Sequence, residues 1–247
     1  MLKLLITHKY VFISLMLMMS ESINNKRYEW WDVAEKLARQ SFQLRRESSL
    51  GTAFMASQAF EHKSKNRHYC FATAWHVIDD ILEDQKFILF RHHDKLAVSC
   101  STDRIMTARL GPEAFDLGFF FFRTRDNLLP PEQMMPVRGL KTFPSLGEDL
   151  GWYGYPGSLE STPIFCRGTL ASFKTKPHCY LINGIAYPGM SGSAIADQFG
   201  WVIGVVSEWW EDPNLPKIPG MLQAAPSAMI RHVLEDRLGA RILENEL

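Results

Sequence analysis

The chain of 247 residues is poor in cysteine, carries no excess of either charge and has no long apolar run. Its four cysteines, at positions 70, 100, 166 and 179, include no C-x-x-C pair, which argues against a structural zinc site or a thioredoxin-type redox centre. Cys166 with Cys179, and Cys70 with Cys100, could form bridges between neighbouring strands, but buried free thiols fit equally well. We therefore expect no bound metal.

Charge and composition limit the class of protein further. Lys and Arg (27) balance Asp and Glu (27), whereas a dedicated nucleic-acid binder normally needs a surplus of cations, so we expect no nucleic-acid partner. Hydrophobic residues make up 46% and charged residues 22%, which is typical of a folded globule and excludes a mainly disordered chain. Because compact domains have roughly 100–200 residues, this length predicts one large domain or two small ones.

The N-terminus has the order of a signal peptide. Lys3 and Lys9 precede an apolar stretch at residues 10–19, and Ser20-Glu21-Ser22 follows it. This stretch is too short to cross a bilayer, so we expect no stable membrane span. A signal peptide at residues 1–22, the interpretation we favour, would make the protein periplasmic or secreted; a disordered leader, or a translation start at Met16, Met18 or Met19, would leave it cytoplasmic.

Two helices are predicted at the ends of a β-rich chain. Apolar residues recur at helical spacing over residues 27–40, which predicts an amphipathic helix on the outside of the main domain. A second helix is predicted after Pro226, beginning near Ser227 and ending at Gly239. Between them lie short β-rich runs at residues 51–54, 69–73, 86–90, 117–122, 150–155, 164–173, 179–182 and 202–207. Many short strands without long helices between them predict an all-β barrel or sandwich.

Three short segments carry residues that could do chemistry. They are Thr73-Ala74-Trp75-His76-Val77, Phe115-Asp116-Leu117-Gly118-Phe119 and the glycine-rich Pro188-Gly189-Met190-Ser191-Gly192-Ser193-Ala194-Ile195. Taken singly, His76 reads as a structural histidine, Asp116 as a cap at a strand edge and the third segment as a hairpin turn. Together they supply what amide hydrolysis needs, namely a nucleophile, a base, an anion that orients the base, and backbone donors for an oxyanion.

At this point the sequence resembles a known family, the trypsin-like (chymotrypsin-fold) serine peptidases, and most closely their compact bacterial branch. The motifs that carry the resemblance are Gly51-Thr52-Ala53-Phe54, Thr73-Ala74-Trp75-His76, Phe115-Asp116-Leu117-Gly118, Gly154-Tyr155-Pro156-Gly157, Gly189-Met190-Ser191-Gly192-Ser193 and Gly204-Val205-Val206-Ser207. They occur in the family's order of His, Asp and Ser and cover roughly residues 45–235. The resemblance implies two packed six-stranded antiparallel β-barrels with the active site between them, and no cofactor.

The resemblance also implies roles for particular residues. His76 would be the general base, Asp116 its orienting carboxylate and Ser191 the nucleophile, with the backbone amides of Gly189 and Ser191 as the oxyanion hole. Ser207 matches the position whose hydroxyl supports the aspartate, and Ser207-Glu208-Trp209 would pair with the substrate backbone. Ile185 would lie at the floor of the specificity pocket with Ala186 beside it, so we expect an apolar or small residue before the cleaved bond.

Several residues depart from the family's pattern. Met190 stands where animal members carry an aspartate that pairs with a newly formed N-terminus, so activation by that ion pair is not expected. Ala53 replaces a usual glycine and Ala194 a frequent proline, and neither change touches the chemistry. Glu208 and Trp209 replace an aromatic residue and a glycine, so the substrate groove is expected to be narrowed.

The sequence thus predicts a trypsin-like serine endopeptidase that acts on a polypeptide through an acyl-enzyme. The expected organisation is a leader at residues 1–22, a helical segment at 23–44 and a peptidase domain at 45–247. Within that domain we expect a first barrel at about 45–126, a linker at about 127–140 and a second barrel with the C-terminal helix at about 141–247; no appended peptide-binding domain is expected. The alternative is a catalytically silent pair of barrels that binds peptides or proteins.

Overall fold

The first half of the chain forms a curled, open sheet of seven strands. The structure is a computed structural model that describes residues 26–46, 49–61, 65–83, 86–109, 116–130, 133–138, 143–159, 162–175, 178–209 and 220–234. The strand order in the first sheet is β5-β4-β1-β2-β3-β7-β6. Its strands are β1 (Ser41–Arg45), β2 (Ser49–Glu61), β3 (Asn66–Thr73), β4 (Lys86–Arg91), β5 (Leu96–Ser101), β6 (Met106–Arg109) and β7 (Gly118–Thr124). All neighbouring strands run antiparallel.

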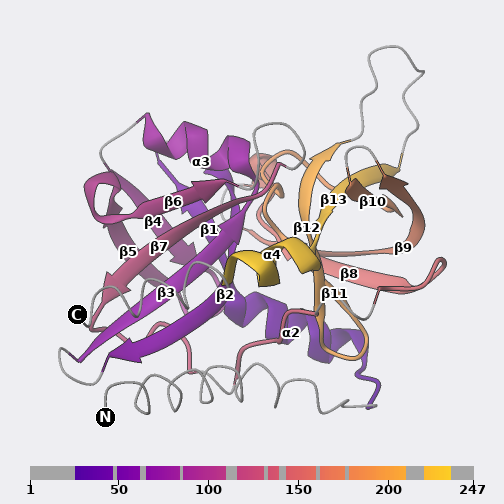
Figure 1. Ribbon diagram of the computed structural model, residues 1–247, viewed down its shortest axis with the longest axis horizontal. Coiled ribbons are helices and arrows are strands. Elements are labelled where there is room, and N and C mark those ends of the chain that lie inside the picture. Colours follow the sequence, from indigo (N-terminus) through magenta and orange to yellow (C-terminus); the bar gives the residue numbers. More distant parts are fainter. Residues whose placement is uncertain are drawn as a thin grey trace, which may run out of the picture.

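The second half forms a closed barrel of six strands in the order β10-β13-β12-β11-β8-β9. Figure 1 shows this second barrel beside the first sheet. Its strands are β8 (Asp149–Gly154), β9 (Ile164–Thr175), β10 (His178–Asn183), β11 (Ala194–Asp197), β12 (Val202–Trp209) and β13 (Met221–Pro226). The predicted all-β architecture of two sheets is therefore confirmed, although the first sheet is an open half-barrel of seven strands in the described residues, whereas a closed barrel of six was expected.

The helices lie at the borders of the two sheets. Helix α2 (Trp30–Gln40) agrees with the predicted N-terminal helix, and it buries Val33 and Leu37 against β8, β11 and β1. Helix α4 (Ser227–Val233) begins at the predicted serine and contacts β12 and β13. The expected stop at Gly239 and the possible signal peptide at residues 1–22 lie outside the described residues. Short 3₁₀ turns occupy Thr102–Arg104 and Gly157–Leu159.

Helix α3 (Trp75–Leu82) is not among the elements expected from the sequence, which predicted only the strand at residues 69–73 before His76. Its buried residues are Val77, Ile78 and Ile81, whose spacing of three and four residues places them on one face of a helix. Such a short helix gains little stability from its own hydrogen bonds, so packing of this face holds it on the sheet. His76 thus lies in the first turn of α3.

An apolar cluster, which we call the interface core, joins the first sheet to the second barrel. Its members come from α2, from the first sheet, from residue 135 between the sheets, from the second barrel and from α4; they are Val33, Leu37, Phe54, Ala56, Cys70, Ala72, Leu117, Phe119, Met135, Ala194, Ala196, Val202, Val205, Ala225, Ile230, Val233 and Leu234. Burial of this much apolar surface makes the interface core a major source of stability, at roughly 25 cal/mol per Å². Each sheet has a further core of its own.

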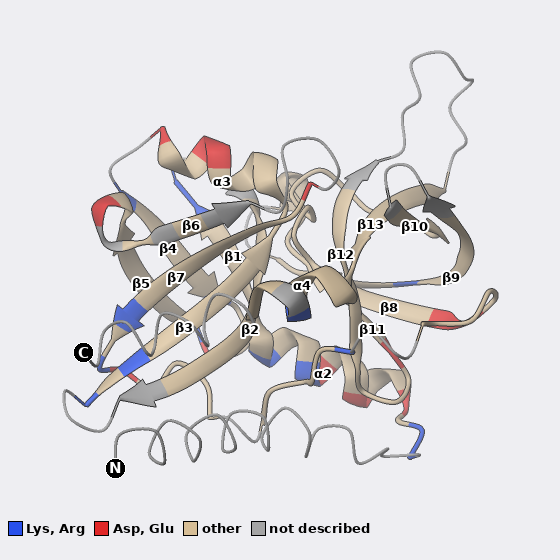
Figure 2. Cartoon of the chain, viewed as in Figure 1, with Lys and Arg blue, Asp and Glu red and all other residues tan. Residues whose placement is uncertain are grey.

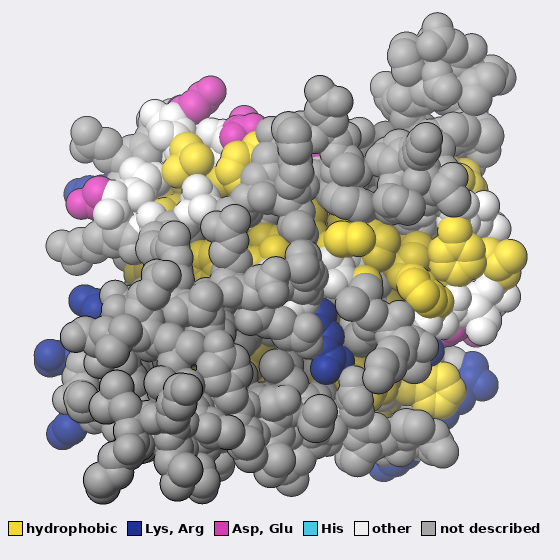
Figure 3. All heavy atoms as spheres, viewed as in Figure 1, with side chains coloured by type: hydrophobic (Ala, Val, Ile, Leu, Met, Phe, Trp, Pro, Cys, Tyr) yellow, Lys and Arg dark blue, Asp and Glu magenta, His cyan; other side chains and the backbone are white. Residues whose placement is uncertain are grey.

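The described surface mixes both charges with scattered apolar side chains. Figure 2 shows acidic residues on α3 and basic residues toward the ends of β3 and β7, with no continuous basic face among the residues that it colours. Large hydrophobic side chains also reach solvent, and Figure 3 shows apolar atoms at the surface on the side of the second barrel. None of the described helices has the length and hydropathy needed to span a membrane.

Candidate active site between the two sheets

His76 is brought to the border of the two sheets by the close packing of α3 on β7. A side chain at Gly118, the first residue of β7, would meet Trp75 and Ile78, with Cε3 of Trp75 only 2.8 Å from the added Cβ. Glycine therefore lets α3 lie directly on the strand. Because Asp116 is two residues before Gly118, this contact also brings the carboxylate to the first turn of the helix.

Asp116 holds His76 through two hydrogen bonds. The backbone N–H of His76 donates to Oδ1 of Asp116 at 3.0 Å, and Nδ1 of the imidazole lies 2.7 Å from Oδ2. The first N–H groups of a helix have no partner within the helix, so this carboxylate satisfies one of them and also lies at the favourable end of the helix dipole. The same contact fixes the imidazole ring with its Nε2 atom directed away from the carboxylate.

The glycine-rich segment forms a tight loop at the rim of the second barrel. Gly189 and Gly192 have φ values of +93° and +91°, which residues with a side chain rarely adopt. The N–H of Met190 donates to the carbonyl of Tyr187 at 2.9 Å, and the N–H of Gly192 to the carbonyl of Val206 at 2.7 Å. These bonds, together with the buried side chain of Met190, give residues 187–193 a fixed shape.

This loop touches the first sheet beside His76. The N–H of Thr52 donates to the carbonyl of Ser191 at 2.9 Å. A Cβ atom at Gly51 would lie 2.7 Å from the side chain of Val77, the neighbour of His76, and 3.3 Å from the Ser191 carbonyl oxygen. The fold therefore gathers His76, Asp116 and Ser191 in one region, from stretches far apart in the chain. Among the described residues no hydrogen bond joins the Ser191 hydroxyl to the imidazole.

Two backbone N–H groups in the loop have no acceptor among the residues that the structure describes. The carbonyl of Pro188 accepts a hydrogen bond from the N–H of Gly157 at 2.9 Å, and in a trans peptide the following N–H, that of Gly189, points the opposite way. Within the part of the chain that the structure describes, neither the N–H of Gly189 nor that of Ser191 donates to another group. Two such donors, two residues apart in a turn, can bind an anion.

The end of β12 offers a backbone edge next to the loop. Strand β11 pairs with β12 only up to Ala194 opposite Val205, whereas β13 still pairs with Trp209. In the described residues, the backbone at positions 207–209 is therefore not covered by β11. Ser207 is buried, and no hydrogen bond joins its hydroxyl to Asp116 among the described contacts. The side chains of Glu208 and Trp209 lie outside the described part of the structure.

The two residues expected to form the specificity pocket differ in exposure. Ala186 is buried, but Ile185 is 48% exposed and, with Tyr187, lines an open hollow of about 470 Å³. The other lining residues are Cys166, Arg167, Asn183, Gly184 and Gly220. The preference for an apolar or small residue remains a prediction, because this hollow shows no enclosed floor at Ile185.

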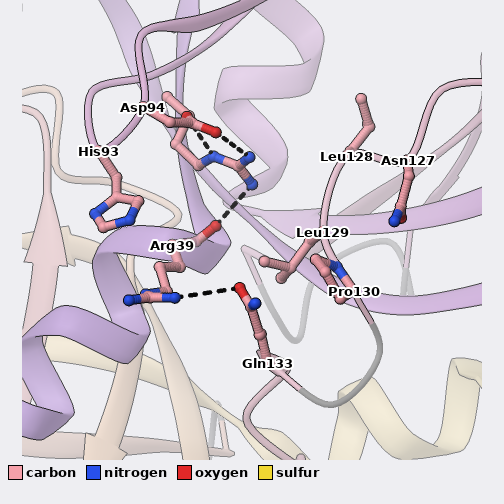
Figure 4. Close-up of a pocket in the computed structure, with 9 residues that line it drawn as sticks. Arg39, His93, Asp94, Asn127, Leu128, Leu129, Pro130 and Gln133 are labelled. Atoms are coloured by element: carbon pink, nitrogen blue, oxygen red, sulfur yellow. Dashed lines mark hydrogen bonds and ion pairs between the residues drawn. The ribbon is translucent and has the colours of Figure 1, made fainter.

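A second cavity, of about 260 Å³, lies elsewhere, between α2, the turn after β4 and the segment that follows β7. Figure 4 shows hydrogen bonds and ion pairs among some of the residues that line it. Arg91 donates twice to the carboxylate of Asp94, at 2.9 and 2.7 Å, and once to the carbonyl of Arg39. Arg39 contacts Glu35 and Gln133 in turn. This cavity contains neither His76 nor the glycine-rich loop, so it is not the candidate active site.

Three of the four cysteines are poorly placed to compete as the nucleophile, because they are buried. All four are free thiols, so neither of the two considered bridges is present. Cys70, Cys100 and Cys179 are buried, and burial raises the pKa of the Cys100 thiol to about 12. A thiol needs its thiolate form to attack, so such a group is inert near neutral pH.

Comparison with known proteins places the fold. No protein-family model matches the chain, and no curated protein sequence does. Among solved structures, the serine endoprotease from Yersinia pestis is 17% identical with a TM-score of 0.60, over 85% of this chain and 66% of that one. The HtrA-type protease AlgW with tripeptide is 15% identical with a TM-score of 0.60, over 84% of this chain and 64% of that one.

A further similar structure is matched over nearly its whole length. The protease Rv3671c from M. tuberculosis H37Rv, in an inactive form, is 16% identical with a TM-score of 0.57, over 82% of this chain and 91% of that one. The chain thus spans about two thirds of the length of the Yersinia and AlgW chains. At these identities the likeness defines the fold alone. The chain has the trypsin-like fold of serine proteases, as its motifs predicted.

Proposed function

We propose that the protein is a serine endopeptidase that hydrolyses peptide bonds through an acyl-enzyme. The observation that carries the proposal is the His76–Asp116 pair, joined at 2.7 Å, at the place where the glycine-rich loop of the second barrel meets the first sheet. The trypsin-like fold of the chain supports it.

His76 is the general base of the proposed reaction. A serine hydroxyl is too weak an acid to attack an amide unaided, and a neutral imidazole can take its proton through Nε2. Asp116, bound to Nδ1, selects the tautomer in which Nε2 carries no proton and can act as the base, and it stabilises the imidazolium that forms. His76 then returns the proton to the leaving amine.

Ser191 is the nucleophile, and its attack builds negative charge on the former carbonyl oxygen. The N–H groups of Gly189 and Ser191, which have no acceptor among the described residues, are the donors that meet this oxyanion. The lack of a hydrogen bond between the Ser191 hydroxyl and His76 is compatible with this role, because such contacts often shorten only when substrate is bound. Water then attacks the acyl-enzyme by the same route.

The substrate is proposed to be an extended polypeptide. The backbone at positions 207–209 lies beyond the end of β11 and can pair with a peptide as an added strand. One of the structurally similar proteins, AlgW, has been solved with a tripeptide. Pairing with main-chain groups leaves the choice of substrate side chain to residues around Ile185 and Ala186.

Labelling with a fluorophosphonate probe tests the assignment. The wild-type chain should be labelled at Ser191, and both Ser191→Ala and His76→Ala should abolish labelling and lower turnover on the order of 10⁴- to 10⁶-fold. Ser193→Ala is the matched control, since this neighbouring hydroxyl is buried without a hydrogen-bond partner among the described residues, and its removal should leave labelling intact. An unlabelled wild-type chain would instead favour a silent peptide-binding module.

A further inference from the structure

Thr52 bonds with groups on both sides of the boundary between the two sheets. It lies in β2, is fully buried and is the first-sheet residue whose N–H binds the Ser191 carbonyl. Its hydroxyl donates to the carbonyl of Gly189 at 2.9 Å and accepts the N–H of Tyr155 at 3.1 Å. Its own carbonyl accepts the hydroxyl of Thr73 at 2.6 Å. We call these five residues and their bonds the Thr52 junction.

The two contacts with the glycine-rich loop fix both ends of its reactive part. The hydroxyl of Thr52 holds the carbonyl of Gly189, and its N–H holds the carbonyl of Ser191. With both carbonyls held on the first sheet, the one peptide group between them, which carries the N–H of Ser191, has little freedom to rotate. The orientation of the Ser191 N–H therefore depends on Thr52. The Gly189 N–H belongs to the preceding peptide group, whose carbonyl, that of Pro188, is held by the N–H of Gly157.

Tyr155, which follows β8 of the second barrel, also anchors the Thr52 junction. Its hydroxyl donates to the carbonyl of Ser41 at 3.3 Å and accepts the N–H of His92 at 3.1 Å, both in the first sheet or its turns. Burial raises the pKa of this phenol to about 12, so it remains a neutral donor. Tyr155 thus holds the end of β8 on the first sheet, and its N–H keeps the Thr52 hydroxyl pointed at Gly189.

We propose that Thr52 is a positioning residue, which holds the Ser191 amide in the orientation that binds the oxyanion together with the Gly189 amide. The inference rests on the proposed function, because it gives the junction a role in catalysis as well as in folding. Thr52 itself touches neither the substrate nor the reacting atoms. A loss of its hydroxyl should slow the chemical step and leave the binding of ground-state peptide almost unchanged.

The first arm of the test is kinetic. Thr52→Val removes the hydroxyl at nearly constant volume, and we expect kcat to fall about 10- to 100-fold with KM within about twofold, since small displacements of donors have effects of this size. Affinity for a peptide boronate, which forms a tetrahedral anion on the serine, should fall in parallel with kcat. Thr52→Ser, which keeps the hydroxyl, should restore both. If the boronate affinity and kcat stay at wild-type values, the proposal is wrong.

Tyr69→Phe is the matched control. The Tyr69 hydroxyl is also buried, donates to a backbone carbonyl (Asp126, 2.9 Å) and accepts a backbone N–H (Leu128, 2.9 Å). Its loss breaks the same two kinds of bond away from the loop. We expect Tyr69→Phe to lose about as much stability as Thr52→Val, with kcat unchanged. An equal fall of kcat in both variants would show that Thr52 has only a structural role.

The second arm does not depend on activity. In amide hydrogen exchange, the N–H groups of Met190 and Gly192 should lose protection in Thr52→Val and keep it in Tyr69→Phe. Each variant is measured at the same number of degrees below its own melting temperature. If Thr52→Val does not fold, Thr52→Ala removes the same hydroxyl with a smaller side chain. If fluorophosphonate fails to label the wild-type chain, the proposed function is wrong. If hydrogen exchange at Met190 and Gly192 is unchanged in the Thr52 variant, the inference about Thr52 is wrong.

Discussion

The first sheet and the second barrel meet in two regions of opposite character. In the interface core, apolar side chains such as Val33, Leu37 and Met135 are excluded from water and make no directional contacts. In the Thr52 junction, hydroxyls and backbone groups are held at fixed distances, and the adjacent loop contains two glycines with positive φ. The contrast suggests a division of labour, in which the core supplies the free energy of folding and the junction the geometry of the site. Substitutions should then separate turnover from stability.

The sharpest separation is expected at Asp116. In Asp116→Asn the amide oxygen can still accept the N–H of His76, but its NH₂ group would face Nδ1 and favour the wrong tautomer of the ring. Turnover should fall by about 10⁴, as in other triads, with the free energy of unfolding changed by less than about 1 kcal/mol. Peptidase kinetics and urea denaturation measure the two quantities.

Asp79→Asn is the control for Asp116→Asn. It removes the same charge from an exposed position on α3, and turnover should remain at the wild-type level. A loss of stability in Asp116→Asn as large as its loss of activity would show that the carboxylate mainly holds the helix, and the proposed division between the two regions would fail there.

A substitution at Gly192 should damage both properties. A Cβ atom would lie 1.8 Å from the carbonyl oxygen of Thr52 and 2.2 Å from the hydroxyl of Thr73, at a φ of +91°. Gly192→Ala should therefore force the loop away from the first sheet, lower turnover about 10²- to 10³-fold and reduce the free energy of unfolding by about 3–5 kcal/mol. The same kinetic and denaturation measurements apply.

Gly147→Ala separates the effect of backbone strain from that of the clash. Its φ is +80°, but an added Cβ would have no heavy atom within 4 Å. It should lose only about 1–2 kcal/mol of stability, with turnover intact. Equal losses in the two alanine variants would mean that the contact with Thr52 and Thr73 adds nothing.

Local patterns in the sequence were enough to predict much of this arrangement. Helical spacing located α2 to within three residues of its start, and Pro226 and Ser227 located the start of α4. The resemblance carried by the motifs around His76, Asp116 and Ser191 implied that these segments would lie near one another. The helix signals lie within a few consecutive residues, so they needed no knowledge of distant contacts. The approach of the three segments is a distant contact, and only the family resemblance implied it.

The features that were missed depend on contacts between distant residues. All four residues of β11 are buried, so the strand shows no alternation of polar and apolar positions. Helix α3 is short and its register is set by packing on β7. Thr52 was noted within the motif Gly51-Thr52-Ala53-Phe54, but its hydroxyl acts on a residue 137 positions away. No spacing in the sequence indicated that contact.

In the interface core, Leu37→Ala should reduce stability without slowing catalysis. Leu37 is fully buried in α2, and its truncation should cost about 2–5 kcal/mol of unfolding free energy. The kcat of the folded fraction should not change, because Leu37 belongs to the interface core and not to the Thr52 junction. Trp31→Ala, at a position 67% exposed on the same helix, should cost less than about 0.5 kcal/mol. A fall in kcat with Leu37→Ala would contradict the division.

The smallest change in stability is expected from a buried polar side chain of the second barrel, Asp197. Asp197 is buried in β11, and Oδ1 accepts the N–H groups of Phe199 and Trp201 at 2.8 and 2.9 Å. Oδ2 lies 3.2 Å from Nη1 of Arg138, which Glu148 also binds. Burial raises the pKa of Asp197 to about 6, partly offset by these hydrogen bonds and by Arg138 and reinforced by the charge of Glu148.

A raised pKa means that the folded state binds the proton more tightly than the unfolded state does. The stability contributed by this carboxyl is therefore fully present below about pH 4 and is lost as the pH rises to about 6. The unfolding free energy of the wild type minus that of Asp197→Asn, which cannot titrate, should fall by about 1–3 kcal/mol between pH 4 and 7. When both chains also carry Glu148→Gln, this difference should fall less steeply with pH, because the negative charge of Glu148 no longer raises the pKa of Asp197. If the difference grows with pH instead, Arg138 stabilises the ionised carboxylate of Asp197. The charged form of Asp197 would then add to the stability of the protein.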